Sequence, residues 1–254
     1  MPRTGEPGRS VTSRALSLLG AFDTAHRRLG LSALAARAQV PLPTAHRLVG
    51  ELVEFGALSR TSSGDYVIGR RLWDLGILAP VQGDLVETAS PFLHDLYSAT
   101  HATVHLAVRD GSAVLYLDRV RGTSSVPILS TVGSLLPLHA TAVGKVLLAY
   151  APPEVGESAM ANLSRHTPYT ITASGMVRRQ LARAQRDGYA TTSEEMSLGA
   201  CSVAVPIRLG ESVIAALGIV VPSLKTQQAR LVSALRVAAS GIGRSLSGAA
   251  APPR

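Results

Sequence analysis

Apolar residues in the first 60 positions recur at the spacing of short amphipathic helices. Positions 11, 15, 18, 19 and 22 fall on one helical face behind a capping Ser10, and Ser32 is suited to cap a second helix. A third helix opens at Pro43, whose missing N–H costs nothing there, and ends at Gly56. The predicted helices span residues 11–22, 33–38 and 43–55. A short helix, a turn and a longer helix form the helix-turn-helix pattern.

The segment after the third helix predicts a hairpin and then a linking helix. Residues 57–60 and 65–68 flank the polar tip 61–64, as the two strands of a wing do. Residues 69–78 carry apolar side chains at helical spacing beside Trp73, the single tryptophan. We expect Trp73 to pack on a neighbouring element rather than to bind a ligand.

The polar face of the third helix carries the candidate DNA contacts. Thr44, His46 and Arg47 lie near its N-terminal end, which would enter the major groove. Arg14 on the first helix and Arg60 at the wing are placed to touch phosphates. The alternative is an ordinary three-helix bundle with a solvated face, in which His46 packs against its own helix.

The remaining two thirds of the chain alternate between strand and helix periodicity. Asp110-Gly111 between two alternating runs indicates a hairpin. Predicted strands span residues 102–108, 113–118, 126–130, 202–208 and 213–221. Predicted helices span residues 86–100, 142–150, 153–162, 173–186 and, behind a capping Thr226, 227–246. Helices packed on an antiparallel sheet make an α+β domain.

Composition agrees with a folded cytoplasmic protein. The chain is 46% hydrophobic over 254 residues, yet no apolar run reaches the ~18 residues of a membrane span. The first ten residues lack the apolar stretch of a signal peptide. A single cysteine, Cys201, excludes an internal disulfide and fits a reducing compartment.

Positive charge is concentrated in the N-terminal third. The net charge is +8; residues 1–80 hold ten arginines and six acidic residues, and residues 81–254 hold fifteen basic and eleven acidic ones. Each part therefore carries +4, at about twice the density in the shorter part. The balance is consistent with a polyanionic partner. Lys145 and Lys225 are the only lysines, a bias toward arginine that a GC-rich genome would also produce. We take this explanation for most of the arginines outside the N-terminal domain.

Two motifs in the second part invite an enzymatic interpretation that their context does not support. Gly144-Lys145 resembles the end of a P-loop, but Val146 replaces the required Ser or Thr. His101 and His105 are four residues apart, as zinc ligands can be, yet their segment is predicted as strand. We therefore predict no metal and no cofactor.

Two further candidates for catalysis are weak for the same reason. The adjacent carboxylates Glu194 and Glu195 point apart on a strand and suit a solvated loop better than an acid–base pair. Cys201 lies in an apolar strand without a histidine partner in sequence, where a buried inert thiol is common. No coherent catalytic set remains.

The stretch from Leu136 to Ala149 instead predicts a binding site. It places small residues at a junction between a loop and a helix. Free backbone N–H groups at a helix start form a seat for a carboxylate.

Several motifs together resemble the IclR family of bacterial regulators. They are residues 10–19, 31–36, 44–48 (Thr-Ala-His-Arg-Leu), 66–69 and the 136–149 stretch, with Gly188-Tyr189, Glu194-Glu195, Gly199 and Cys201 at family-like spacing. The resemblance implies a C-terminal GAF-like domain with a cupped ligand cavity, and a linker helix that helps to pair two subunits. Leu42-Pro43 stands where the family usually carries Lys-Ser, so operator contacts at these two positions are not carried over.

The resemblance also implies which residues surround the ligand. They are Leu138, Ala142, Val143, Thr192, Cys201, Gly218 and Val220. Thr192 replaces an aspartate of the relatives, Gly218 and Val220 replace hydroxyl positions, and Ala200 replaces a common arginine. A less charged pocket favours an aromatic or aliphatic carboxylate over a two-carbon acid. Ordinary core packing is the alternative for each position, and the favoured one for Gly218 and Val220.

These observations predict a ligand-responsive transcriptional regulator, most simply a repressor of a catabolic operon. Its partners would be double-stranded operator DNA, a small carboxylate and further copies of itself in a homodimer or tetramer, with no membrane. The expected parts are a disordered tail 1–9, a winged helix-turn-helix 10–69, a linker helix 70–83, a GAF-like domain 84–247 and a tail 248–254. Two alternatives remain, namely a metabolic enzyme with an accessory helical domain and a sensor that recognises protein rather than DNA.

Overall fold

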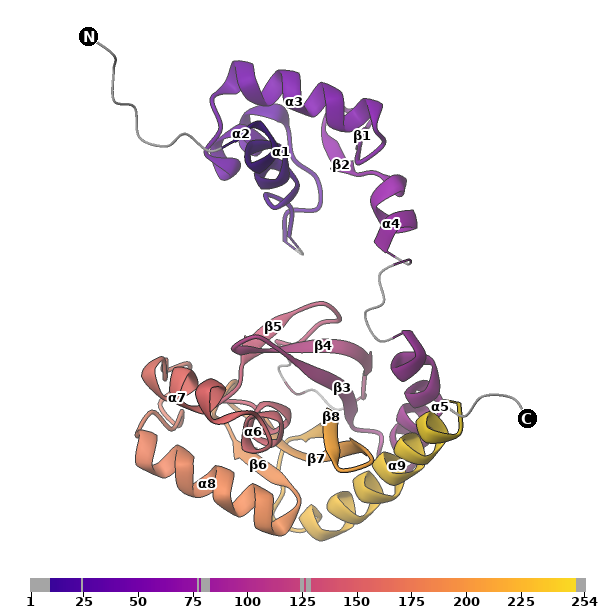
Figure 1. Ribbon diagram of the computed structural model, residues 1–254, viewed down its shortest axis with the longest axis vertical. Helices are drawn as coiled ribbons and strands as arrows, with labels where there is room; N and C mark the ends of the chain where they lie inside the picture. Colours follow the sequence, from indigo (N-terminus) through magenta and orange to yellow (C-terminus); the bar gives the residue numbers. More distant parts are fainter. Residues whose placement is uncertain are drawn as a thin grey trace. The chain divides into compact units, whose positions relative to one another are not determined.

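A computed structural model describes residues 10–23, 25–76, 78, 83–123, 126 and 129–249 (Figure 1). The chain divides into two compact units, residues 1–81 and 82–254, which are considered separately below. Both predicted tails fall mainly outside the described residues, although the last helix extends to Ala249, two residues into the predicted C-terminal tail.

The first unit has the predicted order of helices and hairpin. Its elements are α1 (Val11–Leu19), α2 (Leu31–Ala38), α3 (Leu42–Glu54), β1 (Leu58–Arg60), β2 (Tyr66–Ile68) and α4 (Arg70–Gly76). Leu18, Leu34 and Leu48, one from each of the first three helices, meet in a buried core. The winged helix-turn-helix is therefore confirmed as the N-terminal fold.

Two predicted helix boundaries in this unit were wrong. Helix α1 ends at Leu19 with Gly20 as its C-cap, three residues before the predicted end. Ser32 does not cap α2, because Gly30 occupies the N-cap position and Ser32 lies inside the first turn. The early start of α2 has a long-range cause: two backbone hydrogen bonds, of 3.1 and 2.8 Å, join Leu29 to Tyr66 of the wing and bring the chain into the helix earlier.

Trp73 on helix α4 was expected to pack on a neighbouring element, but its exposed fraction is 62%. The helix itself is short and has no buried residue within the described part of its unit. The role in pairing subunits that the resemblance implies for this helix stays a prediction.

The second unit is an α+β domain built on one curled antiparallel sheet (Figure 1). Its helices are α5 (Gly83–Thr100), α6 (Ala142–Ala149), α7 (Pro153–Ala161), α8 (Ser174–Asp187) and α9 (Gln228–Ala249). Its strands are β3 (Thr103–Asp110), β4 (Ala113–Val120), β5 (Leu135–Pro137), β6 (Ala190–Ser193), β7 (Cys201–Leu209) and β8 (Ser212–Val221). Among the described residues the sheet order is β5-β4-β3-β8-β7-β6.

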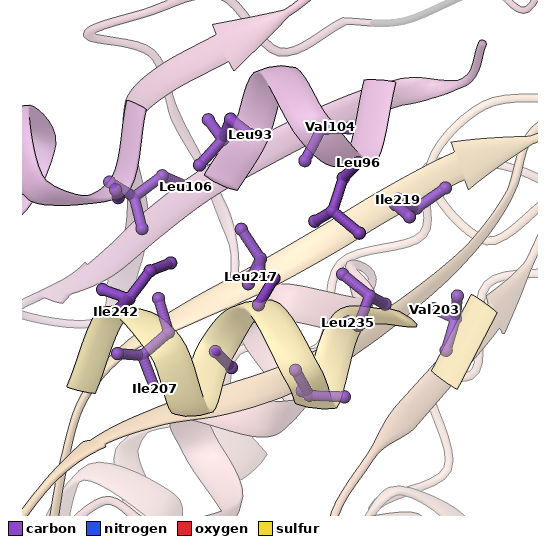
Figure 2. Close-up of a cluster of buried hydrophobic side chains, with 14 of the residues drawn as sticks. Leu93, Leu96, Val104, Leu106, Val203, Ile207, Leu217, Ile219, Leu235 and Ile242 are labelled. Atoms are coloured by element: carbon purple, nitrogen blue, oxygen red, sulfur yellow. The ribbon is translucent and has the colours of Figure 1, made fainter. Parts of the chain in front are cut away.

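Alternation along the central strands separates two layers of core. Leu106 on β3, Ile207 on β7 and Leu217 on β8 face helices α5 and α9, as Figure 2 shows with Leu93 and Leu235 of those helices. The intervening residues of the same strands face α6, whose eight residues are all buried. One sheet face is therefore a dry core, and the other carries the short helix α6.

The sheet differs from the prediction at its two edges. Strand β6 was not predicted, because four residues of sequence Ala-Thr-Thr-Ser give too short an apolar alternation. At the other edge, a strand was predicted over 126–130; of these, 127 and 128 lie outside the described residues and the others are not in a strand. The edge strand is β5 instead, which pairs with β4. In the described part of the chain, no helix has the length and apolar character needed to cross a membrane.

Candidate nucleic-acid interface and ligand cavity

The N-terminal part of helix α3 presents the predicted DNA contacts on one surface. His46 and Arg47 are exposed and Thr44 is half-buried, while Ala45 and Leu48 between and beside them face the core. Arg47 donates to the carboxylate of Glu51 one turn later. An exposed pair of this kind contributes only about 0.3–0.5 kcal/mol, so Arg47 remains available to a phosphate or a guanine.

Arg14 and Arg60 come from other elements of the same unit. Arg14 is half-buried on α1, and Arg60 is exposed on β1. The Arg60 guanidinium donates to the carbonyl of Gly64 at 3.3 Å and lies 5.8 Å from the ring of Tyr66, which holds it along the wing. The geometry brings together Thr44, His46 and Arg47, and leaves the phosphate roles of Arg14 and Arg60 as predictions.

A cavity lies between α6 and the face of the sheet that α6 covers. Its floor includes Thr192, Ser202 and Val220, which are cross-strand neighbours on β6, β7 and β8. His105 and Gly218, paired across β3 and β8, lie two residues further along the same face. The empty space is about 520 Å³, a volume that includes the open mouth of the cavity.

The start of helix α6 forms the wall of this cavity. Thr141 is the N-cap, and its hydroxyl oxygen accepts from the N–H of Gly144 at 3.1 Å. Ala142 and Val143 occupy the first two helical positions and line the cavity. Backbone N–H groups at these positions have no carbonyl one turn earlier, so they can donate to an anion, and the helix dipole favours negative charge there.

A buried histidine supplies a polar group that sequence reasoning missed. The Nε2 atom of His105 lies 2.8 Å from the hydroxyl of Ser130, and its ring meets Tyr116 edge-on at 5.1 Å. Burial, assisted by the charge of Arg119, lowers the pKa of His105 to about 3, so the imidazole is neutral. Burial also raises the pKa of Tyr116, whose hydroxyl bonds to Thr141. Three elements thus meet at one neutral, hydrogen-bonding corner.

This histidine predicts a dependence of stability on pH. The folded state binds the His105 proton only near pH 3, whereas the unfolded chain binds it near its ordinary value of 6.5. Stability from this residue is complete above pH 6.5 and declines as the pH falls toward 3, by up to about 1.4 kcal/mol per unit. Thermal unfolding of the His105→Gln variant between pH 7 and pH 4 should therefore show a shallower loss of Tm than the unmodified protein. An equal change of Tm with pH in the variant and in the unmodified protein would contradict this prediction. His94→Gln, a substitution at an exposed site, serves as the control.

Two of the residues predicted to bind the ligand do not line this cavity. Among the described residues that line the cavity, Cys201 is absent because it faces the α5–α9 core, and its neighbour Ser202 takes the cavity side. Leu138 is buried against α6 and does not line the cavity either. The strand alternation places adjacent residues on opposite faces, so a shift of one residue accounts for the difference at β7. Ser202 also pairs with the hydroxyl of Thr192 at 2.5 Å.

The candidate catalytic and metal motifs separate in the structure. His101 ends α5 in a left-handed conformation and is exposed, so it does not share a site with buried His105. Within the described residues no group of three His, Cys, Asp or Glu side chains could hold a metal ion. The expectation of two solvated carboxylates was wrong for Glu195, which is buried against Lys145, and Glu194 instead caps the N–H of Gly199 at 2.8 Å.

Both units match established sequence families. Residues 11–62 match the IclR helix-turn-helix domain, and residues 79–244 match the bacterial transcriptional regulator IclR C-terminal domain. The HTH-type transcriptional regulator XynR of Escherichia coli (strain K12) is 30% identical over 228 residues, covering 87% of this chain and 89% of that protein. The HTH-type transcriptional repressor AllR of Salmonella typhi is 28% identical over 234 residues, covering 91% and 86%.

Solved structures agree with the sequence comparisons. The crystal structure of an IclR homolog from Microbacterium hydrocarbonoxydans complexed with 4-hydroxybenzoate has 35% sequence identity to this chain and a TM-score of 0.90. The match covers 94% of this chain and 100% of that one. XynR and AllR are named as transcriptional regulators rather than enzymes.

Proposed function

Because this chain belongs to the IclR family of bacterial transcriptional regulators, we propose that it represses a catabolic operon until a small aromatic carboxylic acid binds. The single observation that carries the proposal is the start of α6, with Ala142 and Val143 opening into a neutral cavity. A carboxylate bound there would accept from backbone N–H groups.

The lining of the cavity favours one aromatic ring. Val220, Leu136 and Met196 supply apolar surface, and the hydroxyl pair of Thr192 and Ser202 supplies a neutral partner for a ring substituent. No Asp, Glu, Lys or Arg side chain lines the cavity among the described residues. The relative from Microbacterium hydrocarbonoxydans was solved with 4-hydroxybenzoate, an acid of this class.

On the DNA side, we assign residues 10–69 to operator binding, 70–83 to the linker and 84–247 to effector binding. A single α3 spans only one half-site, so binding to paired half-sites about one helical turn apart requires a dimer at least. The acid would release the operator only as far as it favours one of two subunit arrangements over the other.

The Leu42-Pro43 departure from the family gives a prediction about affinity and salt. Leu42 is 48% exposed at the first position of α3, where the family pattern carries a lysine. The Leu42→Lys variant should bind DNA more tightly, and the slope of log K against log salt should steepen by about 0.9, the value for one added phosphate contact. Fluorescence anisotropy with a duplex between 50 and 200 mM salt, a range of about fourfold, measures both quantities. An unchanged slope would remove this position from the DNA surface, and Leu198→Lys, at an exposed site in the other unit, is the matched control.

Calorimetric titration tests the proposed ligand class. Benzoate and 4-hydroxybenzoate should bind the full chain, and acetate, glucose and AMP should not. Binding of only the sugar or the nucleotide would refute an acid effector, and binding of acetate as tightly as benzoate would refute the aromatic class. Turnover assays on any acid that binds discriminate the enzyme alternative.

A further inference from the structure

A buried ion pair joins helix α6 to the segment that follows strand β6. The Nζ atom of Lys145 donates to Oε1 of Glu195 at 2.6 Å, and the two side chains are only 1% and 5% exposed. Lys145 is one of the two lysines of the chain. Neither residue lines the cavity, so the proposed function leaves this pair without a role.

Each member of the pair belongs to an element that lines the cavity. Lys145 lies in α6 one turn after Thr141, the residue that caps the proposed carboxylate seat. Glu195 directly precedes Met196 and Ser197, which form part of the cavity wall together with Ala200. The pair therefore joins the helix that would hold the acid to segment 194–200, which contributes to the cavity wall.

Two threonine hydroxyls also hydrogen-bond to the backbone of segment 194–200. Thr170 donates to the carbonyl of Glu195 at 2.7 Å, and Thr167 donates to the carbonyl of Glu194 at 2.6 Å. These bonds hold the backbone of the segment but do not reach α6. Lys145 is the side chain of α6 that hydrogen-bonds to the segment in the described structure.

Placing two charges here is costly, which argues for a specific purpose. Burial lowers the pKa of Lys145 and raises the pKa of Glu195, and their mutual attraction opposes both changes. Buried pairs of this kind often contribute no more stability than apolar side chains of similar volume. They fix the relative position of two elements through one directional, charge-assisted hydrogen bond.

We propose that the Lys145–Glu195 ion pair is a positioning element for the effector site, which holds segment 194–200 at a fixed distance from the start of α6. The inference rests on the proposed function for the identity of the ligand, but the position of the segment can be measured without any ligand. Loss of the pair would loosen the wall formed by Met196 and Ser197, and the acid would lose affinity although no group that touches it has changed.

The test uses Lys145→Met, Glu195→Met and the double variant in the full chain. Both single variants leave one buried charge without its partner, and should lower the Tm as well as weaken 4-hydroxybenzoate binding at least tenfold. The double variant removes both charges, so its Tm should return toward that of the unmodified protein. Its dissociation constant should stay at least tenfold raised, and amide hydrogen exchange in 194–200 should stay at least tenfold faster. The control variant is Arg183→Met, which breaks an exposed ion pair of the same unit. It should change neither the dissociation constant for 4-hydroxybenzoate nor the hydrogen exchange of residues 194–200.

The outcomes separate positioning from stability. A double variant with the ligand affinity and exchange rates of the unmodified protein would overturn the inference, because the pair would then serve folding alone. If a single variant does not fold, the double variant decides. If the unmodified protein binds no aromatic acid, the proposed ligand fails and hydrogen exchange decides the inference alone: faster exchange in 194–200 supports it, and unchanged exchange overturns it.

Discussion

Replacing Arg47 by alanine is expected to weaken binding to the operator by about 10- to 100-fold, the worth of one bidentate base contact. Arg47 is exposed near the start of α3, and its only described side-chain bond, to Glu51, is weak enough to be exchanged for DNA. The loss should be largest at one base position of the operator. Anisotropy titrations with operator duplexes that carry single substitutions would show it.

Arg60→Ala provides the comparison for that experiment. If Arg60 touches a phosphate, its replacement should weaken binding to all sequences about equally. The slope of log K against log salt should become shallower by about 0.9, the value for one phosphate contact. If Arg47→Ala behaved in the same way, Arg47 would be a phosphate ligand and sequence recognition would lie elsewhere on α3. If neither variant lost affinity, this surface would not be the DNA interface.

The Gly218→Ala substitution is expected to raise the concentration of acid needed for a response at least tenfold while operator binding persists. A Cβ atom at Gly218 would lie 2.7 Å from Cγ1 of Val143, well inside contact distance. Valine in a helix has one strongly preferred rotamer, so the first turn of α6 must move rather than the side chain. Overpacking of this kind costs about 1–3 kcal/mol. The same movement displaces the carboxylate seat, and the affinity for 4-hydroxybenzoate should fall at least tenfold by calorimetry.

A second glycine in the same unit supplies the control. Gly175 is in helix α8, and a Cβ added there would have no atom within 4 Å. Gly175→Ala should therefore leave the ligand affinity unchanged. Equal affinity in Gly218→Ala and Gly175→Ala would show that the contact between Val143 and the sheet does not control the site.

Local patterns predicted most of the fold because each element carries its own signal. The hairpin at Gly111, the left-handed end of α8 at Gly188 and the cap of α6 at Thr141 depend on neighbours within a few residues. The errors occurred where contacts between residues distant in sequence determine where an element begins or whether it forms. Helix α2 begins early because the wing holds Leu29, and β6 exists because it pairs with β7, although its four residues show little strand pattern alone.

The candidate site could be predicted only in part. The start of α6 was identified because a helix N-terminus next to small residues has a recognisable sequence. Which residues of β7 face the cavity was not identified, because alternation shows which residues share a face of the sheet but not which helix covers that face. His105 was weighed only as a metal ligand, because its partner Ser130 lies 25 residues away in sequence. Glu195 was taken as solvated, because nothing local reveals that Lys145, 50 residues earlier, reaches it.

The central claim, that an acid bound in the second unit controls DNA binding by the first, has one direct test. The measurement is the affinity of the full chain for the DNA upstream of its own gene, by fluorescence anisotropy at fixed salt, with and without saturating 4-hydroxybenzoate. A coupling of about 1–3 kcal/mol predicts that the acid weakens operator binding about 5- to 150-fold, with no effect on a random duplex. Equal operator affinity in the presence and absence of bound acid would contradict the claim.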